Sequence, residues 1–210
     1  MKTYVKILLC LLLAGALCSC GGGPSTFDRG RTVYETILSR KSVRQFSERK
    51  VSRDTIEMLL RAAMSAPSGR DVRPWSFVVL EDKSRFEEVF TRQNFNLDNF
   101  LGSAAVIVVC IDTLNYVRNA DGERVLAPNR TWRDDAGAAT ENLLLCAEGL
   151  GLGAVWTASY PYKERYLPVK KGLGLPPEVI PYSMVPIGYP AGQLSPKDKW
   201  RPDRIHWEKW

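Results

Sequence analysis

Residues 134–150 are the segment that most constrains the fold of this chain. Their apolar side chains follow helical spacing and mark one face: Ala136, Ala139, Leu143, Ala147 and Leu150. Leu144, Leu145 and Cys146 extend the apolar surface almost all round. A helix that is apolar on nearly every side is buried, either in a large core or against another subunit. The sequence therefore predicts a central helix here.

Short apolar runs between amphipathic segments predict the remaining elements. We expect strands at 75–80, 104–111, 153–158 and 183–189. Helices are expected at 32–40, from Ser52 to the "SAPSG" that ends at Gly69, at 82–93 and at 162–172. Residues 113–131 look irregular around a turn signal, "NADGE". Helices that alternate with a few strands favour an α+β or α/β sandwich built on one sheet.

Residues 1–20 carry the pattern of an export signal. Lys2 and Lys6 precede an apolar run at 7–17, which is shorter than the about 20 residues that a membrane-spanning helix needs. A basic start, a short apolar core and small residues are typical of secretion. The "LCSC" at 17–20 resembles the lipobox of bacterial lipoproteins.

This pattern predicts three parts of the chain. Residues 1–19 would be a signal peptide, residues 20–31 a lipidated Cys20 with a flexible Gly-rich tether, and residues 32–210 one domain. The protein would then be a membrane-anchored lipoprotein of the bacterial cell envelope that faces the periplasm. An ordinary secretory signal or a buried N-terminal strand is the alternative.

Charge and cysteines exclude some classes of function. The net charge of +6 falls to +4 without the signal, because Lys2 and Lys6 leave and no acid does. An anionic cofactor accounts for such a mild excess, so we expect no nucleic-acid partner. Cys110 and Cys146 lie in apolar segments and read as buried hydrophobic residues, although a disulfide between them stays open. The single histidine, His206, has no Cys or His near it, so we expect no metal site.

Two further segments could bind a phosphorylated, planar ligand. In an extended "RKSVR" (40–44), Arg40, Ser42 and Arg44 would point together, which suits a phosphate dianion. Lys41 would point the other way. The residues "APSGRDVRPW" (66–75) form a turn that connects a helix to a strand, and its backbone amides could contact the ring of a planar ligand. A solvated basic edge and a plain connection are the respective alternatives.

Glycines at 149, 151 and 153 follow a helix and lead into a strand. A dinucleotide-binding fingerprint needs the reverse order, so these glycines end the helix and permit close packing. The strand after them could present backbone from Trp156 to Ala158. The C-terminal residues 195–210 combine basic residues with aromatic rings, and rings seek burial. We expect this segment to dock on a partner subunit or on the back of the domain.

Together these segments resemble the nitroreductase family of FMN-dependent oxidoreductases from about residue 33 to the C-terminus. The resemblance rests on "RKSVR", "APSGRDVRPWSF", "ATENLLLCAEGLGLGAVW" and "PIGYP" followed by basic residues. It implies an α+β sandwich with a central mixed sheet flanked by helices, and an intertwined homodimer with two FMN sites at its interface. The residues that it assigns to FMN are Arg40, Lys41, Ser42, Arg44, Pro67, Ser68, Gly69, Asp71, Arg73, Trp156, Thr157, Ala158, Lys197 and Lys199.

Two positions depart from the family pattern, because Asp71 and Arg73 stand where Asn and Gln are usual. An ionised Asp can only accept hydrogen bonds, whereas Asn can also donate them. We therefore expect these two replacements to alter the contacts to the flavin ring and the reduction potential of the flavin more than they alter FMN binding itself. Arg73 could pair with Asp71 or stabilise charge on the reduced flavin. We also expect residues 113–131 to cover the substrate.

The resemblance implies hydride transfer from NADH or NADPH through flavin N5 to a nitroaromatic, a quinone or a related small aromatic acceptor, in a ping-pong reaction. The cofactor carries the chemistry, and the protein needs no catalytic side chain of its own. Export conflicts with a cytoplasmic donor, so two alternatives stay open. One is an envelope lipoprotein that binds flavin or a planar ligand without turnover, and the other is a reductive enzyme for one aromatic, such as a dehalogenase.

Overall fold

The computed structural model describes residues 26–210, with side chains from Thr32 onward. The expected signal peptide and Cys20 lie outside the described residues. The chain divides into two units, residues 1–35 and residues 36–210, and the description below concerns the second.

The helices are α2 (Thr26–Ser39), α3 (Arg53–Met64), α4 (Ser84–Val89), α5 (Asp98–Leu101), α6 (Trp132–Gly149) and α7 (Lys163–Gly172), with short 3-10 turns η1 (Gly69–Asp71) and η2 (Pro202–Arg204). The strands are β1 (Trp75–Leu80), β2 (Ala105–Asp112), β3 (Leu114–Arg118), β4 (Arg124–Pro128), β5 (Gly153–Ala154), β6 (Thr157–Ala158) and β7 (Val179–Gly188).

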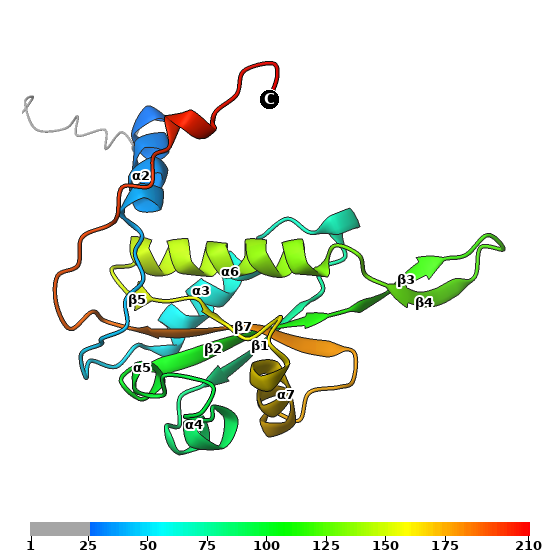
Figure 1. Cartoon of the computed structure of the whole chain (residues 1–210), viewed down its shortest axis with the longest axis horizontal. Coiled ribbons are helices and arrows are strands. Elements are labelled where there is room, and N and C mark those ends of the chain that lie inside the picture. Colours follow the sequence, from blue (N-terminus) through cyan, green and yellow to red (C-terminus); the bar gives the residue numbers. More distant parts are fainter. Residues whose placement is uncertain (1–25) are drawn as a thin grey trace, which may run out of the picture. The chain divides into compact units, whose positions relative to one another are not determined.

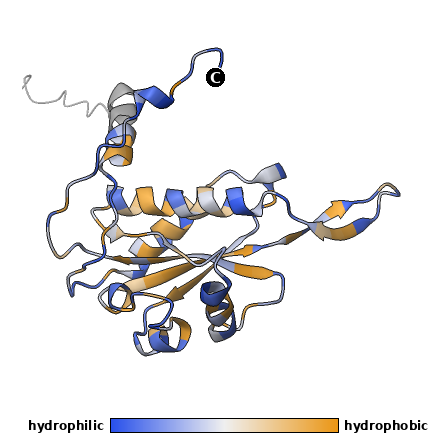
Figure 2. Cartoon of the chain, viewed as in Figure 1, coloured by the Kyte–Doolittle hydropathy of each residue, from blue (hydrophilic) through white to orange (hydrophobic). Residues whose placement is uncertain are grey.

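The central sheet has the order β1-β2-β7-β5, with β6 also paired to β7. Every pairing between these strands is antiparallel, and the one parallel pairing is an isolated bridge from Ser42 to Ala154. The expected mixed character of the sheet is therefore confined to its β5 edge. β2 is buried along almost its whole length and carries the most continuous apolar run. Figure 2 shows this hydrophobic centre running through the sheet.

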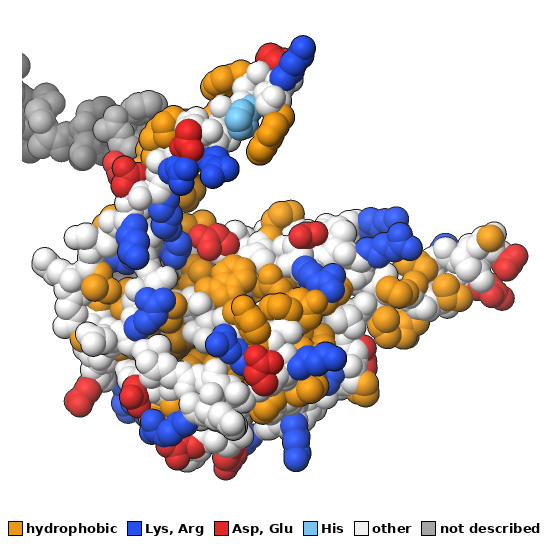
Figure 3. Space-filling model, in the orientation of Figure 1, with side chains coloured by type: hydrophobic (Ala, Val, Ile, Leu, Met, Phe, Trp, Pro, Cys, Tyr) orange, Lys and Arg blue, Asp and Glu red, His pale blue; other side chains and the backbone are white. Residues whose placement is uncertain are grey.

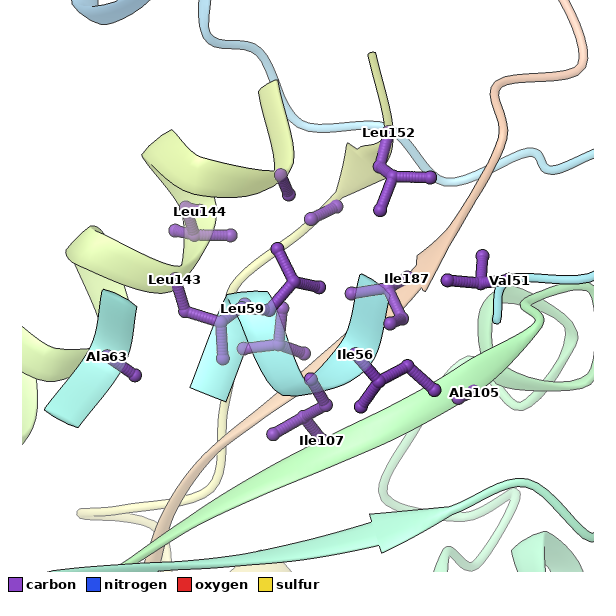
Figure 4. Close-up of a cluster of buried hydrophobic side chains, with 13 residues drawn as sticks. Val51, Ile56, Leu59, Ala63, Ala105, Ile107, Leu143, Leu144, Leu152 and Ile187 are labelled. Carbon is purple, nitrogen blue, oxygen red and sulfur yellow. The ribbon is translucent and has the colours of Figure 1, made fainter. Parts of the chain in front are cut away.

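Helices cover both faces of the sheet, as expected for an α+β sandwich (Figure 1). Alternate residues of a strand point to opposite faces, so β2 sends Ile107 to one core and Val108 to the other. α3 and α6 cover the Ile107 side, where Leu59 and Leu143 are both fully buried (Figure 4). α4, α5 and α7 cover the other side. The predicted central helix is α6, which packs against the sheet and α3.

The prediction that residues 113–131 are irregular is wrong. β3 and β4 form an antiparallel hairpin there, with Leu114 opposite Pro128 and Arg118 opposite Arg124. The "NADGE" sequence closes it, because the Asn119 side-chain oxygen accepts the backbone N–H groups of Asp121 and Glu123. A local side-chain cap of this kind lets two short strands pair although both are largely exposed.

The expected helix at 82–93 is also too long, because α4 ends at Val89. Phe90 has an extended backbone and stacks on Phe100, with 4.6 Å between ring centroids. Phe95 lies edge-on to both rings. Burial of these aromatic rings outweighs continuation of the helix.

The two cysteines differ in burial. Cys110 is buried in β2, as expected, and this burial raises the pKa of its thiol to about 12. Cys146 is partly exposed on α6, which corrects the expectation that it is buried. Both thiols are free, so no disulfide joins them.

Candidate functional site

The segment at 40–44 lies beside β5. The Val43 N–H donates to the carbonyl of Ala154 at 3.0 Å, and Ser42 forms the parallel bridge to the same residue. Val43 is buried against Gly153, whereas Ser42 and Arg44 are exposed. Alternation about Val43 therefore turns Ser42 and Arg44 away from the core together, as the extended pattern predicts.

Arg40 and Lys41 are held by acids of α6. Arg40 Nε lies 3.1 Å from Glu141 Oε1, and Lys41 Nζ lies 2.9 Å from Glu148 Oε1. Glu141 and Glu148 are two helical turns apart and so share one stripe of α6. Arg40 directly follows α2 and does not belong to the extended run. These ion pairs offset both charges, so the structure does not group Arg40 with Ser42 and Arg44 as an open phosphate clamp.

Arg44 lines a hollow of about 240 Å³ together with Trp156, Thr157 and Ala158. The hollow also contains Arg165, which donates from its NH1 group to the Ala158 carbonyl at 3.3 Å. No carboxylate is among its lining residues. Two guanidinium groups beside a hollow suit an anion, because they offer several charged donors at once. The fold thus joins two of the four predicted segments, 40–44 and 156–158.

The predicted turn at 67–73 is fixed on the first turn of α6. The Gly69 N–H donates to Asp135 Oδ1 at 2.9 Å, and Thr131 Oγ1 donates to Asp135 Oδ2 at 3.1 Å. A Cβ atom on Gly69 would lie 2.3 Å from Thr131 Oγ1. Gly69 therefore permits close approach, as expected, but to the helix. Its amide is occupied by Asp135, while Pro67 is exposed and Ser68 partly so.

Asp71 and Arg73 form an exposed ion pair. Arg73 Nε donates to Asp71 Oδ1 at 2.8 Å, and the Arg73 backbone N–H donates to Ser68 Oγ at 3.0 Å. The hydrogen bond and the charge of Arg73 hold the pKa of Asp71 below its usual range. Asp71 is therefore an ionised acceptor. Both residues have positive φ, 55° and 51°, so the turn presents them in a conformation that side chains rarely adopt.

The turn and the 40–44 segment contact α6 at different positions. Gly69 contacts the helix at Asp135, Arg40 at Glu141 and Lys41 at Glu148. At 1.5 Å per residue, the contacts at Glu141 and Glu148 lie about 9 Å and about 20 Å from Asp135 along the helix axis. The hollow comes nearer to the turn than Lys41 does, because the Trp156 ring lies beside Gly137, two residues after Asp135. The candidate site therefore consists of a basic hollow and a helix-bound turn.

The C-terminal residues join neither part. Lys197 and Lys199 are exposed and have no hydrogen bond or ion pair within the described residues. Trp200, Trp207 and Trp210 are 69%, 84% and 97% exposed. The expectation that these rings dock on the back of the domain is therefore wrong for a single chain.

Sequence reasoning missed three residues that shape these parts. Asp135 is an acid buried in a helix that otherwise buries apolar and small residues, and that contrast was its signal. Thr131 ends the hairpin connection and had no signal of its own. Arg165 lies in α7, far in sequence from Arg44, and nothing in the sequence linked the two.

The described part of the chain has neither a metal site nor a membrane-spanning helix. Within residues 26–210, no cluster of His, Cys, Asp and Glu could hold a metal ion. No helix in the same range is both long and apolar enough to cross a membrane.

Comparison with known proteins gives consistent matches. The sequence model of the nitroreductase family matches residues 37–100 and 85–189. A provisionally named NADH dehydrogenase/NAD(P)H nitroreductase of Methanothermobacter thermautotrophicus is 36% identical over 178 residues, which cover 85% of this chain and 87% of that protein.

Solved structures agree with these matches. The crystal structure of a provisionally named NADH dehydrogenase/NAD(P)H nitroreductase from Bacteroides thetaiotaomicron is 38% identical, with a TM-score of 0.75 over 85% of this chain and 98% of that one. A provisionally named nitroreductase from Desulfovibrio desulfuricans, solved in complex with FMN, has the same fold at 24% identity, with a TM-score of 0.68 over 85% of this chain and 97% of that one.

Proposed function

Because this chain belongs to the nitroreductase family, we propose that it is an FMN-dependent oxidoreductase. NADH or NADPH would be the electron donor, and a nitroaromatic, a quinone or a related small aromatic molecule the acceptor. When bound, FMN supplies the hydride-transfer chemistry at its N5 atom, in a ping-pong exchange between donor and acceptor. The observation that carries this proposal is the basic hollow formed by Arg44, Arg165 and residues 156–158.

The residues of the hollow fit the phosphate end of FMN. Arg44 has no acidic partner within the described residues, and Arg165 makes its one hydrogen bond to a carbonyl. A phosphate dianion would supply the missing negative charge to both. Ser42, which points to the same side as Arg44, adds a hydroxyl donor. Arg40 and Lys41 would hold this segment on α6 through Glu141 and Glu148.

The turn at 67–73 fits the ring end of the flavin. Asp71 is ionised and exposed, so it would accept a hydrogen bond from the N3–H of the ring. Arg73 neutralises Asp71 and would limit how much its charge disfavours electron density on the reduced ring. Asp135 holds the turn at Gly69, and Thr131 in turn donates to Asp135, so the turn is fixed at the start of α6.

We propose an intertwined homodimer, because one chain leaves the aromatic rings of its C-terminal segment uncovered. Three tryptophans of the C-terminal segment are largely exposed, and large rings in water are unfavourable. Docking of this segment on the partner would bury them and could carry Lys197 and Lys199 to the phosphate.

The proposed location is the cell envelope, with Cys20 as the lipid-bearing residue. The support is the sequence pattern of residues 1–20 alone. A donor other than cytoplasmic NAD(P)H, or a relay of electrons to the envelope, would then serve the protein. Binding of FMN without turnover remains the alternative outcome of the tests.

Replacement of Arg44 by Ala tests the proposed phosphate site. Charge-assisted hydrogen bonds contribute about 1.5–3 kcal/mol, so we expect FMN affinity to fall about ten-fold to a hundred-fold. Equilibrium titration of flavin fluorescence measures this. Lys50→Ala is the matched control, because it removes one exposed positive charge from the same segment outside the hollow. Equal FMN affinity of Arg44→Ala and wild type would refute the assignment.

A further inference from the structure

A second cavity, of about 420 Å³, lies under the β3–β4 hairpin. Its walls are Gly69 and Arg70 of the turn, Asn115, Val117 and Arg118 of β3, and the connection 127–131 that leads into α6. Figure 3 shows Lys and Arg side chains gathered where the hairpin joins the body of the molecule. The cavity shares only Gly69 with the residues assigned to the flavin.

The charge of this cavity is positive. Arg70 and Arg130 are exposed and form no ion pair within the described residues. The guanidinium of Arg118 donates to the Gly122 carbonyl at 2.7 Å and so turns toward the hairpin tip. The nearest buried acid, Asp135, already accepts hydrogen bonds from Gly69 and Thr131 and does not line the cavity.

One residue that lines the cavity, Asn129, has a buried donor without a partner. Asn129 is 4% exposed, and its Oδ1 atom accepts a hydrogen bond from the backbone N–H of Thr131 at 3.2 Å. The main-chain N–H can only donate, so this contact fixes the orientation of the amide. The Nδ2 atom is then left buried with no partner. Buried polar atoms nearly always have one, so this atom lacks an acceptor that a ligand could supply.

A second lining residue adds a condition on the ligand. Asn115 lines the cavity, and its Oδ1 atom is a buried acceptor without a partner. Two guanidinium groups and an amide N–H would donate to oxygen atoms that carry negative charge. The Asn115 oxygen would accept a hydrogen bond from a neighbouring O–H or N–H group of the same ligand. A protonated phosphate, or a carboxylate on a molecule that also bears a hydroxyl or amine, has both features.

We propose that this cavity binds the carboxylate or phosphate of a small molecule through Arg70, Arg130 and Asn129. Because Gly69 forms part of the wall, the bound anion lies beside the turn that is assigned to the flavin ring. The site would therefore anchor the charged end of a substrate while its reactive part extends toward the ring. This last step rests on the proposed function, whereas anion binding itself does not.

Titration calorimetry with the full-length, FMN-loaded, oxidised chain tests the proposal without turnover. The carboxylate probe is 4-nitrobenzoate, compared with 4-nitrobenzyl alcohol, which has the same ring and no charge. The phosphate probe is NADP⁺, compared with NAD⁺, because neither oxidised nicotinamide can reduce the flavin. In at least one pair, we expect the probe that carries the additional carboxylate or phosphate to bind more tightly than its counterpart. A preference in the first pair would identify the ligand group as a carboxylate of the electron acceptor, and a preference in the second as a phosphate of the electron donor.

Two variants remove the binding groups separately. Arg130→Gln removes an exposed charge, and Asn129→Asp keeps the acceptor for Thr131 while replacing the unpartnered donor by a negative oxygen. Both should weaken binding of the preferred anion at least about ten-fold and leave its uncharged or unphosphorylated counterpart unchanged. Arg133→Gln is the matched control, because Arg133 is three residues from Arg130 in sequence but donates to the Tyr160 hydroxyl and does not line the cavity. It should bind as wild type does.

The outcomes separate this inference from the proposed function. If the flavin is reduced normally but neither charged probe is preferred, or Arg130→Gln binds as wild type, the cavity holds water only and the inference is wrong. If the flavin is not reduced by any donor yet Arg130→Gln and Asn129→Asp lose anion binding, the anion site stands and the proposed reductase activity falls.

Discussion

Gly153 and Val43 meet where the 40–44 segment crosses β5. A Cβ atom on Gly153 would lie 2.6 Å from Val43 Cγ1, far inside normal contact distance. The absence of a side chain at this position lets Val43 be buried and turns Ser42 and Arg44 outward. A single small residue therefore controls the direction of the proposed phosphate-binding side chains.

Replacement of Gly153 by Ala should destabilise the protein by about 1–3 kcal/mol, since an added methyl group in a packed site forces the backbone apart. Urea unfolding followed by circular dichroism measures the change. Gly149→Ala is the control, because its Cβ would meet Thr36 Cγ2 at an ordinary 3.8 Å and Ala favours the end of α6. Equal stability of both variants would contradict the packing described here.

Single residues were predictable where the local sequence decides their role. The glycines at 149–153 were expected to end a helix and permit close packing, and Gly151 has φ +71° while Gly153 contacts Val43. The pairing of Arg40 with Glu141 was not predictable, because it depends on how α6 lies against the chain after α2. Asp71 and Arg73 could be paired from sequence, since they are two residues apart.

At the scale of elements, α6 has the clearest sequence signal and forms the centre of the core. Leu143 is fully buried among residues of α3, β2 and β7 (Figure 4). The helix was expected at 134–150 and runs from Trp132 to Gly149. The β3–β4 hairpin had a weak signal, because its strands have five residues each and are largely exposed, so no apolar alternation revealed them.

Replacement of Leu143 by Ala should therefore cost about 2–5 kcal/mol of the free energy of unfolding, the usual range for a buried leucine. The same change at Leu150, just after α6 and 36% exposed, should cost less than about 1 kcal/mol. Thermal and urea unfolding of the two variants compare them directly. A similar cost at both positions would mean that α6 does not form the core as described.

At the scale of the whole molecule, one chain leaves the C-terminal lysines of the proposed site unpaired. Lys197 and Lys199 are exposed and make no ion pair within the described residues, whereas the turn at 67–73 and the segment at 40–44 both pack on α6. The sequence could identify these segments by their residue types and order. It could not predict which of them meet within one chain, because that depends on where each segment packs along α6 and on surfaces that a second copy would cover.

The central claim is that these parts together form an FMN-dependent reductase. The most direct measurement is the visible absorption spectrum of the purified full-length protein, recorded before and after anaerobic addition of NADPH or NADH. The account predicts flavin bands that bleach on addition of one of these donors. Bands that persist with both would indicate flavin binding without this turnover, and no bands even after FMN is added would contradict the assignment of the site.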